Sequence, residues 1–175
     1  MNGVDYYSAH RCPIEERKSS PYEVGHGWTV HFKNRGDFVG KEALLHEKKT
    51  GSKWATVGVE YNWNAYEKLF RDKGLPPGLC SKASRSSVPI YALSERQVGY
   101  CTSSTWSPIL KKSIALATIE SEYQKIGQEI LVEVTVEHVR KTVPANVVTM
   151  PFFNPQRKTA RLDQTPVDQK SGDAG

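Results

Sequence analysis

The sequence predicts a mainly β protein in which antiparallel strands form a barrel or a sandwich, preceded by a short strand-turn-helix segment. Two observations lead to this prediction. Alternating apolar and polar residues, the pattern of half-buried strands, recur at short intervals over residues 54–153. Only one short helical pattern interrupts them, whereas a parallel sheet would need a helix between successive strands. An antiparallel, mainly β architecture is therefore expected.

The segment before the barrel begins with a strand pattern. Over residues 22–32, the apolar residues Val24, Trp28, Val30 and Phe32 alternate with polar residues. Two glycines interrupt the alternation, and they indicate a bulge or a close approach of the backbone to a neighbour. The pattern predicts a strand here.

A turn and a helix are expected next. Turn-forming residues occupy positions 34–36. Asp37 is predicted to cap a helix over residues 41–49, because an aspartate can accept hydrogen bonds from the first amides of a helix. Gly51 is predicted to end this helix, because glycine readily adopts the left-handed conformation found at helix C-termini.

Six strand patterns follow. They cover residues 54–61, 88–93, 97–105, 113–120, 129–138 and 142–150. A short helix over residues 64–71 and a loop over residues 73–87 separate the first strand from the second. Residues 156–175 are polar with little to bury, so a disordered tail is expected there.

The composition indicates a soluble globular protein inside the cell. The 175 residues are 38% hydrophobic and 25% charged, which is typical of a chain that folds around an apolar core. No apolar run is long enough to cross a membrane or to serve as a secretory signal, so no membrane partner is expected. The net charge of +5 comes from dispersed basic residues, so nucleic-acid binding is not expected either.

Composition and spacing reveal no complete catalytic or metal-binding arrangement. Cys12, Cys80 and Cys101 are widely spaced, which predicts neither a disulfide framework nor a zinc site. The hydroxyl-rich stretch 102–108, TSSTWSP, contains no histidine or carboxylate. A corner of the barrel held by side-chain to backbone hydrogen bonds is therefore favoured over a nucleophile.

Four blocks of the sequence carry a resemblance to a known family. They are SPYEVGHGWTVHF with DFVGKEALL (20–32 and 37–45), VGYCTSSTWSPILKKSIALATI (98–119), IGQEILVEV (126–134) and PANVVTMPFF (144–153). In this order they resemble the C-terminal half of the aminomethyltransferase family, that of the glycine cleavage system T-protein. Its relatives include dimethylglycine and sarcosine dehydrogenases and folate-dependent demethylases.

The resemblance implies a domain organisation and a function. Residues 52–155 would form an antiparallel barrel of Greek-key or jelly-roll type, and residues 1–51 would be the remnant of a preceding α+β, ferredoxin-like domain that binds folate. Proteins of the family transfer a one-carbon unit, usually an aminomethyl or methyl group, to tetrahydrofolate. The implied cofactor is tetrahydrofolate and the implied second partner is a one-carbon donor. The implied location is the cytoplasm, or the mitochondrial matrix in a eukaryote.

Four residues are candidates for folate or substrate binding. Arg35 resembles an arginine that the family uses to bind folate or its substrate, and Arg157 lies near the family's C-terminal ligand contact; a guanidinium suits a carboxylate or a pterin edge. An exposed turn arginine and a tail residue are the respective alternatives. Trp28 and Trp106 are candidates to stack on folate, although a place in the core is favoured for Trp28, which shares a face with apolar neighbours.

One part of the family pattern is not recognisable in this sequence. The family's first portion, with the aspartate that acts near the reactive folate nitrogen, has no counterpart here. The chain alone is therefore expected to lack turnover, and whether it is an enzyme stays open. The alternative is a non-catalytic barrel that binds a partner chain, either a separate N-terminal half or the lipoyl carrier protein that T-proteins meet.

Overall fold

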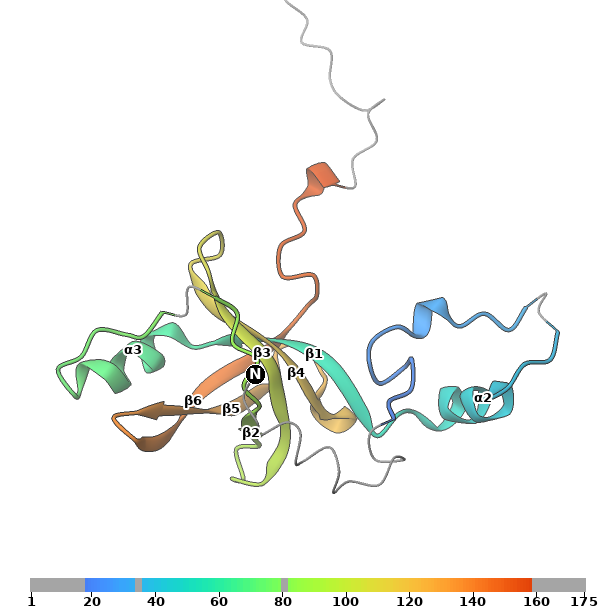
Figure 1. Cartoon of the computed structure of the whole chain (residues 1–175), viewed down its shortest axis with the longest axis horizontal. Helices are drawn as coiled ribbons and strands as arrows, with labels where there is room; N and C mark the ends of the chain where they lie inside the picture. Colours follow the sequence, from blue (N-terminus) through green and yellow to red (C-terminus); the bar gives the residue numbers. More distant parts are fainter. Residues whose placement is uncertain (1–17, 34–35, 80–81, 159–175) are drawn as a thin grey trace, which may run out of the picture.

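Six antiparallel strands close into a barrel in this computed structural model, which describes residues 18–33, 36–79 and 82–158 (Figure 1). The strands are β1 (Trp54–Tyr61), β2 (Val88–Tyr91), β3 (Gln97–Ser107), β4 (Lys112–Glu120), β5 (Glu129–Val136) and β6 (Val139–Val148). The helices are α2 (Lys41–Thr50) and α3 (Trp63–Arg71), with short 3-10 turns at η2 (Gly27–Thr29), η3 (Ser121–Tyr123) and η4 (Gln156–Lys158). None of these helices is both long and apolar enough to cross a membrane.

The strand order is that of a Greek key. Around the barrel the strands follow one another as β1-β4-β3-β2-β5-β6. β2, β3 and β4 are consecutive in the chain and lie side by side, whereas β1 pairs with β4 and is joined to β2 by the long connection that contains α3. Three consecutive strands with a fourth that returns beside them define the Greek key. The predicted antiparallel barrel is confirmed.

The core is the inside of this barrel. Side chains of a strand alternate between its two faces, so each strand buries one face and exposes the other. The fully buried side chains are all apolar, and the largest include Ile90, Ile119, Ile130, Val59, Val132 and Val143. No polar or charged side chain is buried within the described ranges. Burial of apolar area is therefore the main source of the barrel's stability.

The strand boundaries differ from the prediction by up to three residues, and turns explain two of these differences. β2 ends early, since the amide of Ala92 donates a hydrogen bond to the carbonyl of Arg96 and closes a turn. β6 begins at Val139 rather than at position 142, because Glu137 and His138 adopt positive φ angles of 50° and 62° and reverse the chain within two residues.

The strand predicted over residues 22–32 is wrong. The amide of His26 donates to the carbonyl of Pro21, and similar short-range bonds fold this segment into turns and η2. Gly27 lies against the ring of Tyr22, where an added Cβ would come within 2.6 Å of a ring carbon. Proline and glycine therefore favour turns here more strongly than the apolar alternation favours a strand.

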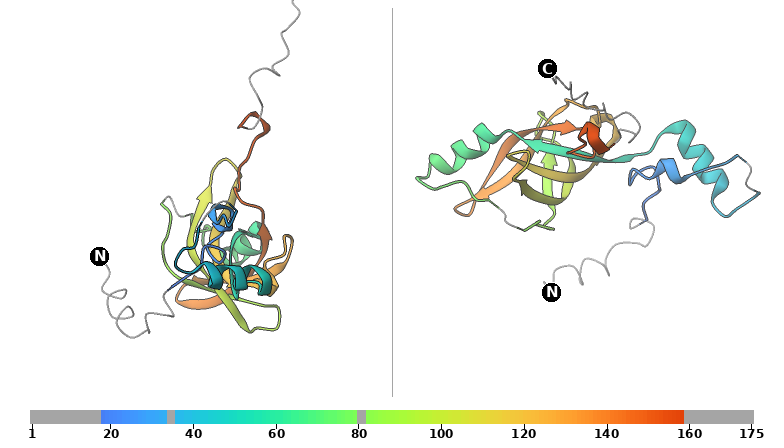
Figure 2. Two further views of the ribbon diagram at one scale, coloured as in Figure 1. Left: turned by 90° about the vertical axis from the view of Figure 1, so that its right-hand side faces the viewer. Right: turned by 90° about the horizontal axis from the view of Figure 1, so that it is seen from above.

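This N-terminal segment is tied to both β1 and α2. The carbonyl of Glu23 accepts hydrogen bonds from the amide and the hydroxyl of Thr56, each at 2.9 Å. The Glu47 carboxylate of α2 accepts from the hydroxyls of Ser20, at 2.5 Å, and Ser52, at 2.7 Å. Figure 2 shows α2 and η2 extending from one end of the barrel, with α3 at the opposite end.

The two ends of α2 match the prediction only in part. Gly40, with φ 88°, occupies the N-cap position, so the predicted cap at Asp37 is wrong; its carboxylate instead lies 3.9 Å from Lys41 Nζ. Gly51 ends the helix as predicted, with φ 85° and its amide bonded to the carbonyl of Glu47.

Candidate functional site

Among the described candidates, Trp28 and Trp106 lie at opposite ends of the barrel. Trp28 lies in η2 and is 77% exposed, so its predicted place in the core is wrong; the strand that would have turned it inward does not form. Arg157 is exposed in η4 and Trp106 is partly buried near the end of β3. Arg35 lies outside the described residues. In Figure 1, η2 stands beside α2, and η4 lies on the segment that leaves the barrel after β6.

Trp106 belongs to a cluster of aromatic rings between the barrel and α3. Its ring centroid lies 4.6 Å from that of Trp63, and the Trp63 ring stacks on Tyr66 at 5.5 Å. Tyr66 also contacts Phe70 at 5.0 Å and meets Tyr61 of β1 edge to face, with 6.3 Å between centroids and 86° between planes. These rings attach α3 to one end of the barrel.

A pocket of about 450 Å³ lies at this end of the barrel. We call it the barrel-mouth pocket, and the inner faces of the strands form much of its wall. Its lining includes Tyr61, Tyr66, Ser104, Trp106, Ser113 and Val134, together with parts of the loop before β2. A register shift in β3 between Cys101 and Ser103 sets these positions, because after it Ser104 pairs with the buried Ala115.

A second hollow lies on the outer face of the barrel. This outer groove, of about 560 Å³, runs between the β3–β4 hairpin and the segment after β6. Its apolar lining includes Ile114, Leu116, Met150, Pro151 and Phe152. None of the side chains that line it is titratable. Arg157 follows Phe152 by five positions in the chain.

An ion-pair cluster holds the turn after β2 to the end of β4. The guanidinium of Arg96 donates two parallel hydrogen bonds to the Glu120 carboxylate, at 2.8 and 2.7 Å, and a third to Glu122 at 2.8 Å. These bonds from Arg96 lower the pKa of Glu120 below its ordinary value of 4.5. Because Arg96 is paired with both carboxylates, this cluster stabilises the fold.

A second polar pair lies on the outer face of β2 and β5. The Tyr91 hydroxyl donates to Glu133 Oε2 at 3.2 Å. Burial, followed by this bond to an anion, raises the pKa of Tyr91 above 10.0. Glu133 also lies on the rim of the barrel-mouth pocket.

Across the described ranges, no group of three histidine, cysteine or acidic side chains is placed to hold a metal ion.

Sequence reasoning missed the part that α3 plays in building a pocket. The spacing of Tyr66, Leu69 and Phe70 correctly predicts a helix with one apolar face. The aromatic residues at positions 63, 66 and 70 are a further signal, because rings three or four residues apart lie on the same side of a helix. What that side covers depends on the closed barrel, which local sequence patterns do not reveal.

Comparisons with known proteins agree with this architecture. Residues 77–154 match the profile of the glycine cleavage T-protein C-terminal barrel domain. Aminomethyltransferases of Prochlorococcus marinus strain NATL2A and Synechococcus elongatus are 36% and 35% identical to this chain over 135 residues, and that of Bacillus pumilus is 35% identical over 134. Each alignment covers 77% of this chain but only 30% or 31% of the relative.

A solved structure shows the same fold. The crystal structure of glycine cleavage system aminomethyltransferase T from Bartonella henselae matches 77% of this chain and 32% of its own, with a TM-score of 0.57 and 18% identity. The closed Greek-key barrel and the matching profile define a C-terminal barrel domain of the glycine cleavage T-protein type. The chain belongs to the aminomethyltransferase family, and it spans about a third of the length of the relatives it matches.

Proposed function

We propose that this chain is the C-terminal portion of a tetrahydrofolate-dependent transferase of aminomethyl or methyl groups. The observation that carries the proposal is the 36% identity over 77% of the chain to proteins named aminomethyltransferase. The closed barrel supports it, because the matching profile describes this domain of the T-protein. Membership of the aminomethyltransferase family supports the proposed folate dependence.

The proposed folate-contacting residues of this chain are Arg35, Arg157 and Trp28. The exposed Arg157 engages no carboxylate among the described residues, so its guanidinium is available to a carboxylate of folate. Trp28 is 77% exposed and offers a ring face for stacking. Trp106 fits this role poorly, because its ring packs against Trp63 of α3, at the end of the barrel opposite η2. Bound tetrahydrofolate would supply the nitrogen that accepts the one-carbon unit.

We further propose that the purified chain has no turnover. Transfer to a folate nitrogen requires a group that moves a proton at that nitrogen. The outer groove is lined by Phe152, five positions before Arg157 in the chain, and none of its lining side chains is titratable. This chain would therefore bind and orient the cofactor, while the proton-transfer group would come from the two thirds of the relatives' length that the chain does not span.

A binding titration tests this function. Tryptophan fluorescence of the full chain is followed during addition of tetrahydrofolate, and the expected result is saturable quenching. Because charge-assisted hydrogen bonds are strong, Arg35→Ala or Arg157→Ala is expected to weaken binding about tenfold. Arg71→Ala, at the end of α3, is the matched control and should bind as the parent does. A folded chain that shows no saturable binding contradicts the folate proposal, and aminomethyl transfer by the purified chain contradicts its inactivity.

The outer groove favours a second candidate function, a non-catalytic module that binds a partner chain. Leu116 and Met150, which line this groove, are 38% and 40% exposed, and contiguous apolar surface of this kind marks interaction sites. An N-terminal half or a lipoyl carrier protein would be the partner. Leu116→Asp should abolish association measured by light scattering, whereas Leu93→Asp, which changes another exposed leucine, should not. A monomer that binds neither partner contradicts this candidate.

A further inference from the structure

The barrel-mouth pocket contains an aromatic corner. Tyr61 and Tyr66 meet with their planes at 86°, and Trp106 lines the same pocket. A flat ligand is held best between two parallel faces. Rings that meet edge to face instead form a corner, which accepts a compact, rounded group, and aromatic rings attract positive charge.

The rings of this corner are held in place by contacts behind them. The Tyr66 hydroxyl donates to the carbonyl of Gly78 at 2.9 Å, and the Tyr61 hydroxyl lies 3.8 Å from Cys101 Sγ. Trp63 packs against Trp106 from α3. Binding of a ligand therefore costs little side-chain entropy, and preorganisation of this kind strengthens binding.

The charge of the pocket selects for cations. Its lining includes one acidic residue, Glu133, and no basic residue. Arg140 lies 3.7 Å from Glu133 but is 79% exposed, so solvent screens its effect, whereas the Glu133 side chain is 14% exposed. The remaining polar groups of the wall include the hydroxyls of Ser104 and Ser113. An anionic ligand would find no ion-pair partner within this lining.

We propose that the barrel-mouth pocket binds a small organic ammonium cation, with its alkylated nitrogen against Tyr61, Tyr66 and Trp106 and its polar end toward the serine hydroxyls. Glu133 supplies a negative charge at the rim. The pocket volume of about 450 Å³ lies within the range common for small-molecule sites. Aromatic faces with a nearby carboxylate are the established chemistry for recognising quaternary ammonium groups.

This site is separate from the proposed folate contacts. It lies under α3, while Trp28 lies in η2 beside α2, at the opposite end of the molecule (Figure 2). Folate carries carboxylates, which the acidic rim repels. The two proposals therefore succeed or fail independently.

The first test uses choline as the cation and 3,3-dimethylbutan-1-ol as its uncharged isostere. Each is added to the full chain, and the indole N–H signals of Trp63 and Trp106 are followed by NMR, with sodium chloride as the ionic-strength control. Choline is expected to shift these signals saturably. The alcohol has the same shape without the charge, so it should bind at least about tenfold more weakly.

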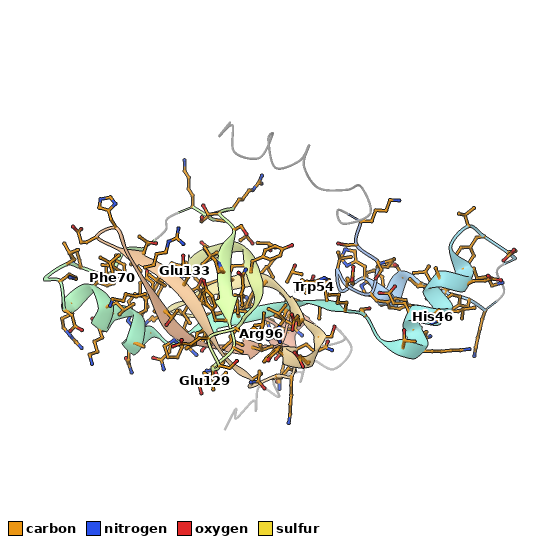
Figure 3. The ribbon with its side chains drawn as sticks, turned by 90° about the horizontal axis from the view of Figure 1, so that it is seen from below. His46, Trp54, Phe70, Arg96, Glu129 and Glu133 are labelled. Carbon is orange, nitrogen blue, oxygen red and sulfur yellow. The ribbon has the colours of Figure 1, made fainter. Side chains whose placement is uncertain are left out.

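Two variants locate the binding. Trp106→Leu removes one wall and should weaken choline binding about tenfold, read on the Trp63 signal. Glu133→Gln keeps the shape and removes the charge, so it should weaken binding about threefold to fivefold. Glu129→Gln is the matched control, because it removes a carboxylate from the same strand; Figure 3 shows Glu133 on the side nearer Phe70 of α3. This control should bind choline as the parent does.

Three results would overturn the proposal. The first is the absence of a saturable shift with choline in the folded parent chain. The second is equal binding of choline and the alcohol, which would make the pocket merely apolar. The third is displacement of choline by tetrahydrofolate, which would place the folate site here. Glutamine has the shape of glutamate and can still accept the hydrogen bond from the Tyr91 hydroxyl, so the Glu133→Gln test remains valid even if Trp106→Leu fails to fold.

Discussion

The ring of Phe152 lies against Gly58 of β1. A Cβ placed at residue 58 would come within 2.9 Å of a Phe152 ring carbon and 3.0 Å of Met150 Cγ. The segment after β6 thus lies on the outer face of the barrel where β1 has no side chain. Because η4 and Arg157 follow this segment, the glycine positions a proposed folate contact as well as one wall of the outer groove.

Gly58→Ala is therefore expected to lift this segment from the barrel. Overpacking of this kind costs about 1–3 kcal/mol in the free energy of unfolding, which urea denaturation measures. Proteolysis near Met150 should become faster as well. Gly36→Ala is the control, since an added Cβ there meets nothing within 4 Å, and its effect should stay within about 1 kcal/mol. Equal stability and equal proteolysis of Gly58→Ala and the parent would show that the contact does not hold the segment.

The barrel itself could be predicted because each strand carries its own signal. β1 begins and ends where alternation predicts, at Trp54 and Tyr61. Burial of one face of each strand depends on that alternation, so the local pattern and the final packing agree. Over residues 22–32 the local pattern and the final structure disagree. The apolar alternation favours a strand, but short-range hydrogen bonds fold the segment into turns.

The candidate site could not be predicted in the same way. Sequence reasoning paired Trp28 with Trp106 because both are tryptophans that suit a flat heterocycle, but spatial proximity depends on how the chain returns on itself. The contact between Trp106 and Trp63 joins β3 to a helix in the β1–β2 connection. Such a contact arises only from barrel closure, which no single window of sequence contains.

Trp63 and Trp106 are expected to stabilise the chain cooperatively. Aromatic pairs at this separation contribute about 0.5–1.5 kcal/mol beyond their buried area. Unfolding free energies of Trp63→Ala, Trp106→Ala and the double variant should therefore give a coupling energy in that range. Trp28→Ala, in the exposed η2 turn, should change stability by less than about 0.5 kcal/mol. Additive losses in the double variant would mean that α3 does not depend on this contact.

The bond from Arg96 to Glu120 predicts a dependence of stability on acid pH. Arg96 lowers the pKa of Glu120 in the folded chain below 4.5, so folding favours the ionised carboxylate. Its contribution is present above pH 4.5 and is lost as the pH falls through the lowered value. Urea unfolding at several acid pH values should therefore show a shallower loss for Arg96→Met than for the parent. Lys41→Met, which removes the pair with the 94% exposed Asp37, should keep the parent's slope.

The buried thiol of Cys101 is expected to make the chain less stable at alkaline pH. It is fully buried beside the Tyr61 hydroxyl, and burial raises its pKa from 9.0 to about 11. Folding thus favours the neutral thiol, so its contribution to stability is complete below pH 9 and declines as the pH rises toward about 11. A chain without this thiol lacks that decline.

Cys101→Ala, in a background with Cys12→Ser and Cys80→Ser, isolates this effect. The alanine leaves a small cavity that costs about 1 kcal/mol at every pH, so the comparison concerns the slope between pH 8 and about 10.5. Unfolding free energies of the Cys101 parent should fall more steeply over this interval than those of the alanine variant, because tyrosine and lysine titrations are common to both. In the same background, a thiol reagent should modify the native parent only through opening of the barrel, so the rate should increase with urea. Labelling at the rate of a free thiol in the folded chain, or equal slopes for both chains, would show that Cys101 is not shielded by the barrel core.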